Sequence, residues 1–377
     1  MSTLTNYLTS NPEIPFVVVG GDNFYPDKSK KKEQKQNKEN NEEKKEKKEK
    51  KDKKKDEKKD KDICTKIINL DKLTSGFNLL PKDIPIYMLL GNHDLETNVG
   101  NEQKFCIQDV NPEVEPEVEE PNSCTILQHE KELVKNSNIT LGTNFATVLN
   151  NTLLLMIDTS IYDTAESELY VPCYNNFYNK TVNIEELRSE QNAWIARTIV
   201  EHVDNGMQNI IVMGHHPITG YKVKKDECIL TELQEPFIDM WKNILNLIPP
   251  RINNISYLCA DIHNYQESVI IFNSHLKKPI HQYIVGTGGT ELDAKKHINC
   301  AERIFSKTSN DIITYTLKTQ LNAEHGFLDC DCSGKMMPTF TFIPTDNQKA
   351  EGKKKRKTRK KPNKRGKKVK SQKFRRI

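Results

Sequence analysis

The chain has 377 residues and carries 57 Lys and Arg against 52 Asp and Glu, a net charge of +5. This length allows one large domain or two small ones with a substantial hydrophobic core. No apolar run is long enough to span a membrane, and the polar stretch Met1–Glu13 lacks the apolar region of a signal peptide. We therefore predict an intracellular protein, cytoplasmic or nuclear.

The positive charge is concentrated in two segments. Residues 28–62 contain 18 lysines against 11 acidic residues, and residues 349–377 contain 17 Lys and Arg against one Glu. The rest of the chain has 22 basic and 40 acidic residues, a net charge of −18. The segment 28–62 has no apolar side chain to bury, so we predict a disordered insertion in a surface loop there and a disordered basic tail at 349–377.

The nine cysteines are an odd number, and no two of them form a CxxC pair. This pattern counts against a cysteine zinc site and favours a reducing compartment. We therefore expect no disulfide framework.

The first half of the chain begins with at most two helical turns in residues 1–15, followed by a buried strand at Phe16–Val19. A helix is expected at Ile63–Leu80 and a strand at Ile84–Leu90. An acidic stretch rich in Pro and Glu follows at 109–123, which predicts an exposed loop.

The second half is predicted to be rich in strands. Two apolar runs on either side of Asn150–Thr152 indicate a hairpin, Phe145–Leu149 with Leu153–Ile157. Ile184–His202 is predicted to be an amphipathic helix, with an apolar face of Leu187, Trp194, Ile195, Ile199 and Val200. Further strands are expected at Ile210–Met213, Ile255–Cys259, Val269–Phe272, His281–Val285, Ile312–Leu317, Gly326–Asp329 and Thr339–Ile343.

Clusters of Asp, Asn and His stand where apolar runs end. FVVV leads into GGDNFY, IPIYMLL into GNHD, and NIIVM into GHHP, and a fourth strand ends in ADIH. Because strand ends in a layered α/β fold gather at one edge, we expect one shared site. Carboxylate, amide and imidazole groups bind hard or borderline metal ions, and a pair of ions about 3.5–4 Å apart needs ligands from several strands. The candidates are Asp22, Asn92, His215, Asp261 and His263.

Each candidate also has a simpler interpretation. Asp22 after two glycines fits a turn residue, and Asn92 and His93 fit a second tight turn. His216, next to a proline, fits an exposed or supporting residue, and His263 fits a hydrogen-bonded polar residue. The GTGGT stretch at Gly286–Thr290 suits a phosphate cradle or, more simply, a tight turn.

The motifs GDNFY, GNHD and GHHP, in this order, resemble those of the calcineurin-like metallophosphoesterases. The motif GDNFY resembles that of the purple acid phosphatase branch in particular. The similarity extends over about Phe16–Ile343, apart from the lysine-rich insertion and the acidic loop. It implies an α/β fold, a four-layer α-β-β-α sandwich with two mixed sheets, in a single domain at residues 1–348.

The resemblance also implies a role for each residue. Asp22 would bridge two metal ions, Tyr25 would bind the first ion, and Asn92 and His215 would bind the second. The last motif of the family is GHxH, which aligns with Ala260–His263, so Asp261 would replace a histidine ligand while His263 is retained. His93 would lie beside the phosphate, and His216 is the second catalytic candidate.

The sequence departs from the family pattern in two places. The family begins with a strand that carries an aspartate in a DxG or DxH motif, and the 20 residues before Gly21 supply neither. The branch also has a histidine shortly after GHxP, where this chain has Lys222, Lys224 and Lys225. We therefore expect a fold that lacks its N-terminal strand and a site that lacks one metal ligand.

Two functions of different classes follow. The first is a metal-dependent phosphoesterase, in which two divalent or trivalent ions (Fe, Zn or Mn) polarise the phosphoryl group and a metal-bound hydroxide attacks phosphorus. The second is a catalytically degenerate protein of the same fold that binds nucleic acid or a protein through its basic tail. Blocks such as KKKRKTRKK at Lys353–Lys361 suit a nuclear-localisation signal or contact with nucleic acid or another anionic partner, and they suit a solubilising tail equally well.

Overall fold

The computed structural model describes residues 2–21, 77–95, 124–135, 137–164, 166–231, 233–252, 254–287, 292–293, 298–301, 303–307, 312–321, 323–333 and 337–345. The lysine-rich insertion, the acidic loop and the basic tail lie outside these residues, as does most of the helix expected at Ile63–Leu80. None of the helices within these ranges is long and apolar enough to cross a membrane.

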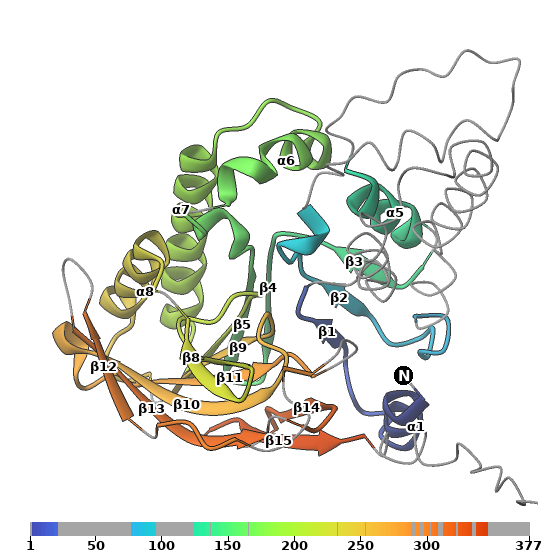
Figure 1. The fold of residues 1–377 in the computed structure, drawn as a ribbon. Coiled ribbons are helices and arrows are strands. Elements are labelled where there is room, and N and C mark those ends of the chain that lie inside the picture. The colour runs from blue at the N-terminus through green and yellow to red at the C-terminus, as the bar shows by residue number, and fades with distance from the viewer. Residues whose placement is uncertain are drawn as a thin grey trace, which may run out of the picture. The chain divides into compact units, whose positions relative to one another are not determined.

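The fold is built on a large mixed sheet of eight strands in the order β12-β13-β10-β11-β9-β6-β5-β4 (Figure 1). The neighbours β5, β6, β9 and β11 run parallel, and the strands on either side of this group pair antiparallel. The sheet consists of β4 (Asn144–Leu149), β5 (Thr152–Ile157), β6 (Asn209–Met213), β9 (Asn254–Cys259), β10 (Tyr265–Phe272), β11 (Ile280–Val285), β12 (Arg303–Lys307) and β13 (Ile312–Leu321). The predicted hairpin, β4 with β5, is confirmed.

A smaller sheet has the order β1-β2-β3, formed by Val17–Val19, Ile86–Met88 and Ile139–Leu141. All three strands are parallel, so the expectation of two mixed sheets is wrong for the described strands. The small sheet is packed on both faces, with Val17 and Val19 on one side and Val18 on the other, and strands covered on both faces can pair in parallel. Strand β1 itself is half-buried and not fully buried as expected. Between Ser2 and Phe16 the chain forms helix α1 (Ser2–Ser10) and no strand.

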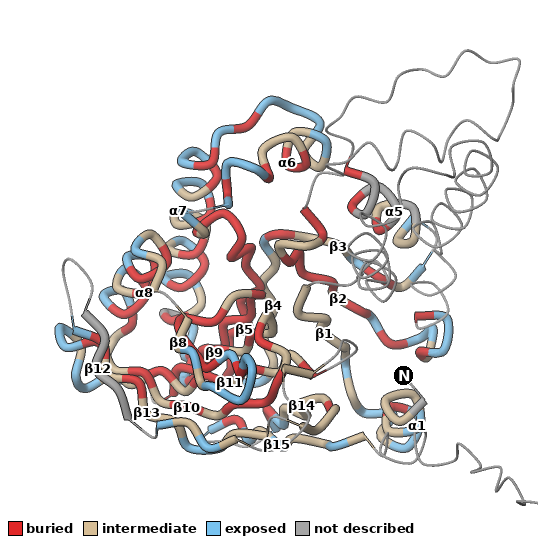
Figure 2. Tube along the Cα trace, viewed as in Figure 1, coloured by how far each residue is buried: buried red, intermediate tan, exposed pale blue. Residues whose placement is uncertain are grey.

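Alternating side chains place the two sheets against each other. In β5, Leu153 and Leu155 pack with the helices, whereas Leu154 and Met156 pack with Val18 and other residues of the small sheet. Every residue of β5 and β6 is therefore buried. The opposite face of the small sheet packs against α1 and α5 (Thr125–Val134). Figure 2 shows the burial of the central strands of the large sheet.

Helices α7 (Ile184–Asp204) and α8 (Glu235–Leu247) lie side by side on the large sheet (Figure 1). The side chain of Asn183 caps α7 by accepting from the backbone N–H groups of Glu185 and Glu186. Leu187, Ile195 and Ile199 of the predicted apolar face are buried and Trp194 is partly buried. Val200 is 49% exposed, so its placement on that face is wrong. It lies about 100° around the helix from Ile199.

The remaining described elements are short. Helix α6 spans Val171–Tyr178, and single-turn 3-10 helices span His93–Leu95 (η2), Ser160–Tyr162 (η3), Ser167–Tyr170 (η4) and Asn273–His275 (η5). Two hairpins pair β7 (Tyr221–Lys224) with β8 (Glu227–Leu230), and β14 (Gly326–Asp331) with β15 (Thr339–Pro344).

Two disulfides, Cys124–Cys173 and Cys228–Cys300, contradict the expectation that the chain has no disulfide framework. The partners lie 49 and 72 residues apart, so their pairing depends on the tertiary fold and not on a local spacing. Disulfides of this kind persist in oxidising compartments. The prediction of an intracellular protein therefore loses the support it drew from the cysteines.

The Cys124–Cys173 disulfide joins the start of α5 to α6 in a fully buried position. We expect the double variant Cys124→Ser/Cys173→Ser to lose about 2–5 kcal/mol of unfolding free energy, because the crosslink no longer restricts the unfolded chain. Urea unfolding without reductant measures this loss. The control is Cys259→Ser, which replaces a buried cysteine outside any disulfide. A double variant that unfolds at the same urea concentration as the wild type would contradict the expected crosslink.

Candidate metal centre

The ends of four strands, β1 and β2 of the small sheet and β6 and β9 of the large sheet, meet at one place. The carbonyl of Gly20, after β1, lies 2.7 Å from His215 Nδ1, after β6. The backbones also approach closely. If Gly21 had a Cβ, it would lie 2.7 Å from the backbone nitrogen of Gly91, which follows β2. A Cβ on Gly20 would lie 3.1 Å from the Cβ of Ala260, which follows β9. These contacts leave room only for glycine at Gly21, where φ is +90°.

His215 is buried and held in one orientation. Its Nδ1 faces a carbonyl oxygen, which can only accept, so Nδ1 carries the proton and donates to Gly20. In the neutral imidazole the lone pair is then on Nε2, which lies 3.2 Å from Oδ1 of Asn92. Two acceptors therefore face each other. This contact is favourable when the imidazole is protonated, when the Asn92 amide is turned so that its nitrogen donates to Nε2, or when a cation is shared by both atoms.

The adjacent His216 differs from His215 in which ring nitrogen accepts a hydrogen bond. The hydroxyl oxygen of Thr159 accepts from the backbone N–H groups of His215 (3.1 Å) and His216 (2.8 Å). Both of its lone pairs are thereby used, so the Thr159 hydroxyl donates its proton to His216 Nδ1 at 3.1 Å. The neutral His216 imidazole therefore carries its proton on Nε2, which makes that nitrogen a hydrogen-bond donor in this arrangement.

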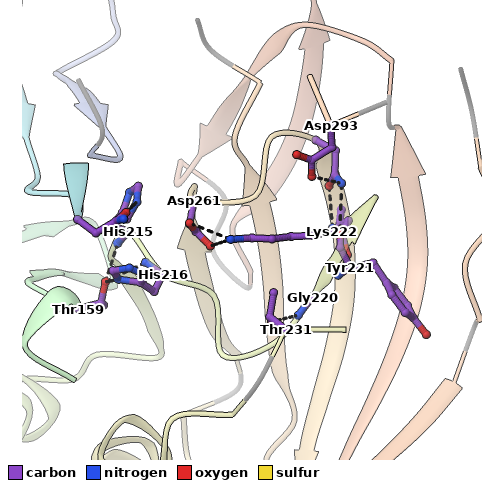
Figure 3. A network of polar contacts seen from close by, with 12 residues as sticks. Thr159, His215, His216, Gly220, Tyr221, Lys222, Thr231, Asp261 and Asp293 are labelled. Carbon is purple, nitrogen blue, oxygen red and sulfur yellow. Dashed lines mark hydrogen bonds and ion pairs between the residues drawn. The ribbon is translucent and has the colours of Figure 1, made fainter. Parts of the chain in front are cut away.

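Asp261 supplies the carboxylate of the site. One ligand atom each from His215, His216 and Asp261 lie within 4.8 Å of one another (Figure 3). The Asp261 backbone has φ +34°, a left-handed conformation that Asp tolerates better than most residues. Burial alone would raise the pKa of Asp261, but its electrostatic interactions with His216, Lys222 and His215 outweigh burial and lower that pKa. The carboxylate is therefore held in its ionised form.

Asn92 owes its position to Asp94, a fully buried residue two positions later. The Asp94 carboxylate accepts from the backbone N–H of Gly91 at 2.9 Å, and the backbone N–H of Leu95 bonds to the carbonyl of Asn92 at 3.2 Å. These bonds close the tight turn that was one interpretation of GNHD. The turn and the ligand interpretations are compatible, because the turn is what points Asn92 at His215.

The other predicted residues are placed less centrally. His93 is the first residue of η2 and is partly buried. It is not a member of the cluster of His215, His216 and Asp261. His263 is also outside that cluster and lies next to Asp293, whose backbone N–H bonds to its carbonyl at 3.0 Å. Asp22 and Tyr25 lie outside the described residues.

Among solved protein structures, similar chains are found. The fold is similar to that of a purple acid phosphatase from yellow lupin (Lupinus luteus) seeds. The match covers 69% of this chain and 38% of the lupin chain, with 12% sequence identity and a TM-score of 0.39. No protein-family model and no curated protein matches the chain. This chain thus spans less than half the length of the lupin protein.

Sequence reasoning missed three residues that shape the site, Thr159, Asp94 and Lys222. Thr159 lies two residues after the predicted strand Leu153–Ile157. It therefore meets the same criterion as the other candidates, which are polar residues near the end of a strand. Asp94 is the last residue of the GNHD motif, and the motif alone assigns it no role. The ion pair of Lys222 with Asp261 has no signal in the sequence, because the two residues meet only through the fold.

Asp158 lies directly before Thr159 and anchors the turn after β5. Its carboxylate accepts from the Tyr174 hydroxyl at 2.6 Å and from the backbone N–H of Ser160 at 2.8 Å. Burial raises the pKa of Asp158 to about 6, although both hydrogen bonds act to lower it. The folded protein therefore binds this proton more tightly than the unfolded chain, in which the pKa is near 3.8.

This shift predicts a pH-dependent effect of Asp158→Asn. Between pH values of about 4 and 6 the folded state binds more protons than the unfolded state, so the contribution of Asp158 to unfolding free energy falls as pH rises. The variant lacks this titrating carboxyl group, and its unfolding free energy relative to wild type should rise by about 2 kcal/mol from pH 4 to pH 7.5. Urea unfolding of both proteins at the two pH values measures the difference. A difference that does not change with pH would show that Asp158 titrates normally.

Proposed function

We propose that the chain is a metal-dependent phosphoesterase whose metal site is built on His215, Asn92 and Asp261. The observation that carries the proposal is the approach of His215 Nε2 to Asn92 Oδ1 at 3.2 Å, beside an ionised carboxylate. An imidazole nitrogen and an amide oxygen that approach each other beside a carboxylate are suited to binding a cation. The order of GDNFY, GNHD and GHHP in the sequence supports the same function.

The residues fit a divalent or trivalent ion of the kind expected, Fe, Zn or Mn. Imidazole, amide oxygen and carboxylate are the usual donors for these ions. His215 also has the support that metal-binding histidines usually have, because its other nitrogen donates to a backbone carbonyl. When bound, such ions polarise a phosphoryl group and lower the pKa of a water molecule that attacks it.

The chain's own residues would divide the remaining work. His216 presents an Nε2–H, set by Thr159, that suits hydrogen bonding to a phosphoryl oxygen or protonation of the leaving oxygen. We assign a similar role to His93. Asp22, the residue after Gly21, is proposed as the ligand that bridges two ions, with Tyr25 and His263 as further ligands.

The packing of the sheets agrees with the proposed four-layer α-β-β-α sandwich. Helices α7 and α8 cover one face of the large sheet, the small sheet covers the other, and α1 and α5 lie beyond the small sheet. The candidate site lies where strands of both sheets end, which is where ligands bind in open α/β folds.

The test is to purify the full chain and to measure bound Fe, Zn and Mn together with hydrolysis of a chromogenic phosphate monoester, with and without added metal. We expect at least one ion per chain and turnover that depends on it. Less than one ion per chain and no turnover would overturn the proposal. Metal binding without any hydrolysis would favour the degenerate, non-catalytic alternative. A purple colour that is lost in Tyr25→Phe would support Tyr25 as an iron ligand.

A further inference from the structure

Lys222 lies at the site through an ion pair with the proposed metal ligand Asp261. Its Nζ is 3.1 Å from Oδ2 and 3.4 Å from Oδ1 of that carboxylate. In Figure 3, Asp261 lies between the two histidines and Lys222. The Lys222 side chain remains 47% exposed, whereas that of Asp261 is 15% exposed. The ammonium group therefore contacts the site and is also open to a solute.

The position of Lys222 is fixed by its backbone and not by its flexible side chain. The neighbouring Tyr221 is buried, and its carbonyl accepts from the side-chain amides of Gln266 (2.8 Å) and Asn264 (3.1 Å). Its N–H donates to the side-chain oxygen of Gln266 at 3.0 Å. Since Gln266 belongs to β10, these bonds tie β7 to the large sheet.

The rest of the hairpin is held equally firmly. Lys225 and Asp226, which connect β7 to β8, have φ values of 54° and 66°. Positive φ at both positions is the geometry of the tight hairpin turn that matches the twist of the strands. The Cys228–Cys300 disulfide anchors β8. Lys222 is thus presented to the site by a rigid hairpin, unlike an ordinary surface lysine.

We propose that Lys222 is the anion-binding residue of this site, holding a phosphate or phosphoryl oxygen next to the metal ion. This inference deepens the proposed function and rests on it. An ammonium group has three N–H donors. Asp261 uses at most two of them, and sharing the carboxylate with a metal ion would loosen its hold on the ammonium. A phosphate bound between a metal ion and Lys222 would then neutralise both positive charges.

Asp293 is the second carboxylate near Lys222. Among the described residues, however, the ion pair of Lys222 is with Asp261. The Asp293 carboxylate lies 3.4 Å from the side-chain amide of Asn264. Asp261 is therefore the acidic group that holds Lys222.

Lys224 provides a matched control. It lies two residues further along β7, on the same face of the strand, and is exposed. Among the residues that the structure describes, it makes no ion pair with the site. Lys222→Met and Lys224→Met remove the same charge from the same strand, so only the contact with Asp261 distinguishes them.

The experiment titrates inorganic phosphate into the full chain by calorimetry, with and without zinc or manganese, for wild type, Lys222→Met and Lys224→Met. Metal affinity is measured separately in each by competition with a chelator. For the metal-loaded chain we expect Lys222→Met to weaken phosphate binding about tenfold or more and Lys224→Met to change it less than about twofold. Metal binding should persist in Lys222→Met, because removing an ammonium removes repulsion of the ion.

The outcomes separate this inference from the proposed function. Equal phosphate affinity in the three metal-loaded proteins, or an equal loss in both variants, would overturn the role of Lys222 while leaving the metal site intact. A wild-type chain that binds no metal would overturn the proposed function together with the inference that rests on it. Recovery of phosphate binding in Lys222→Arg, which keeps the charge, would support a direct contact.

Discussion

His215→Ala is expected to lower the affinity of the chain for zinc or manganese about a hundredfold or more and to abolish phosphoester hydrolysis. The imidazole is buried, and its Nδ1–H is held by the carbonyl of Gly20, so its Nε2 lone pair is aimed at the site before any ion arrives. Its removal would delete a proposed ligand and also the contact that joins the end of β6 to the end of β1. Competition with a chromogenic chelator measures the affinity.

His275→Ala is the control for this variant. His275 lies in η5 and bonds to Asn246 through an exposed contact at 2.7 Å, away from the cluster of His215, His216 and Asp261. It should bind metal as the wild type does. If His215→Ala and His275→Ala bound metal equally well, His215 would not be a ligand. Circular dichroism of both variants separates the loss of a ligand from the loss of the fold.

Gly21→Ala is expected to cost about 2–4 kcal/mol of unfolding free energy and to weaken metal binding at the same time. Its φ of +90° is strained for any residue with a Cβ, and that Cβ would lie 2.7 Å from both His215 Nδ1 and the backbone nitrogen of Gly91. Either the imidazole or the end of β2 must move. The site would therefore be disturbed by a methyl group that removes no ligand.

Urea unfolding and chelator competition measure the two effects of Gly21→Ala. The control is Gly142→Ala, because a Cβ at Gly142 meets nothing within 4 Å. That change should alter stability by less than about 0.5 kcal/mol. Equal stability and equal metal affinity in the two variants would show that the ends of β1 and β2 do not press against His215.

The strands of the large sheet were predictable because their signals are local. Apolar runs such as Ile210–Met213 end at glycines and polar residues, and the structure places β6 and β9 within one residue of the expected bounds. Helix α7 was predictable for the same reason, from the period of its apolar residues. The parallel pairing of the small sheet was not, because pairing direction depends on which segments meet.

The position of the candidate site was predictable to the extent that strand ends gather at one edge of a sheet. This principle predicted Asn92, His215 and Asp261, and in the structure His215 lies close to both of the others. It also predicted His263, which lies next to Asp293. The proton positions of the two histidines could not be read from GHHP, since they depend on Gly20 and Thr159, residues distant in sequence. The disulfides were missed for the same reason.

The most direct test of the central claim is anomalous diffraction from crystals of the full chain grown with zinc or manganese. We predict an anomalous peak at coordination distance from His215 Nε2, about 2.0–2.1 Å for zinc and a histidine nitrogen, with Asp261 and Asn92 oxygens also in contact. A peak elsewhere, or no peak and a protonated His215 bonded directly to Asn92, would contradict it.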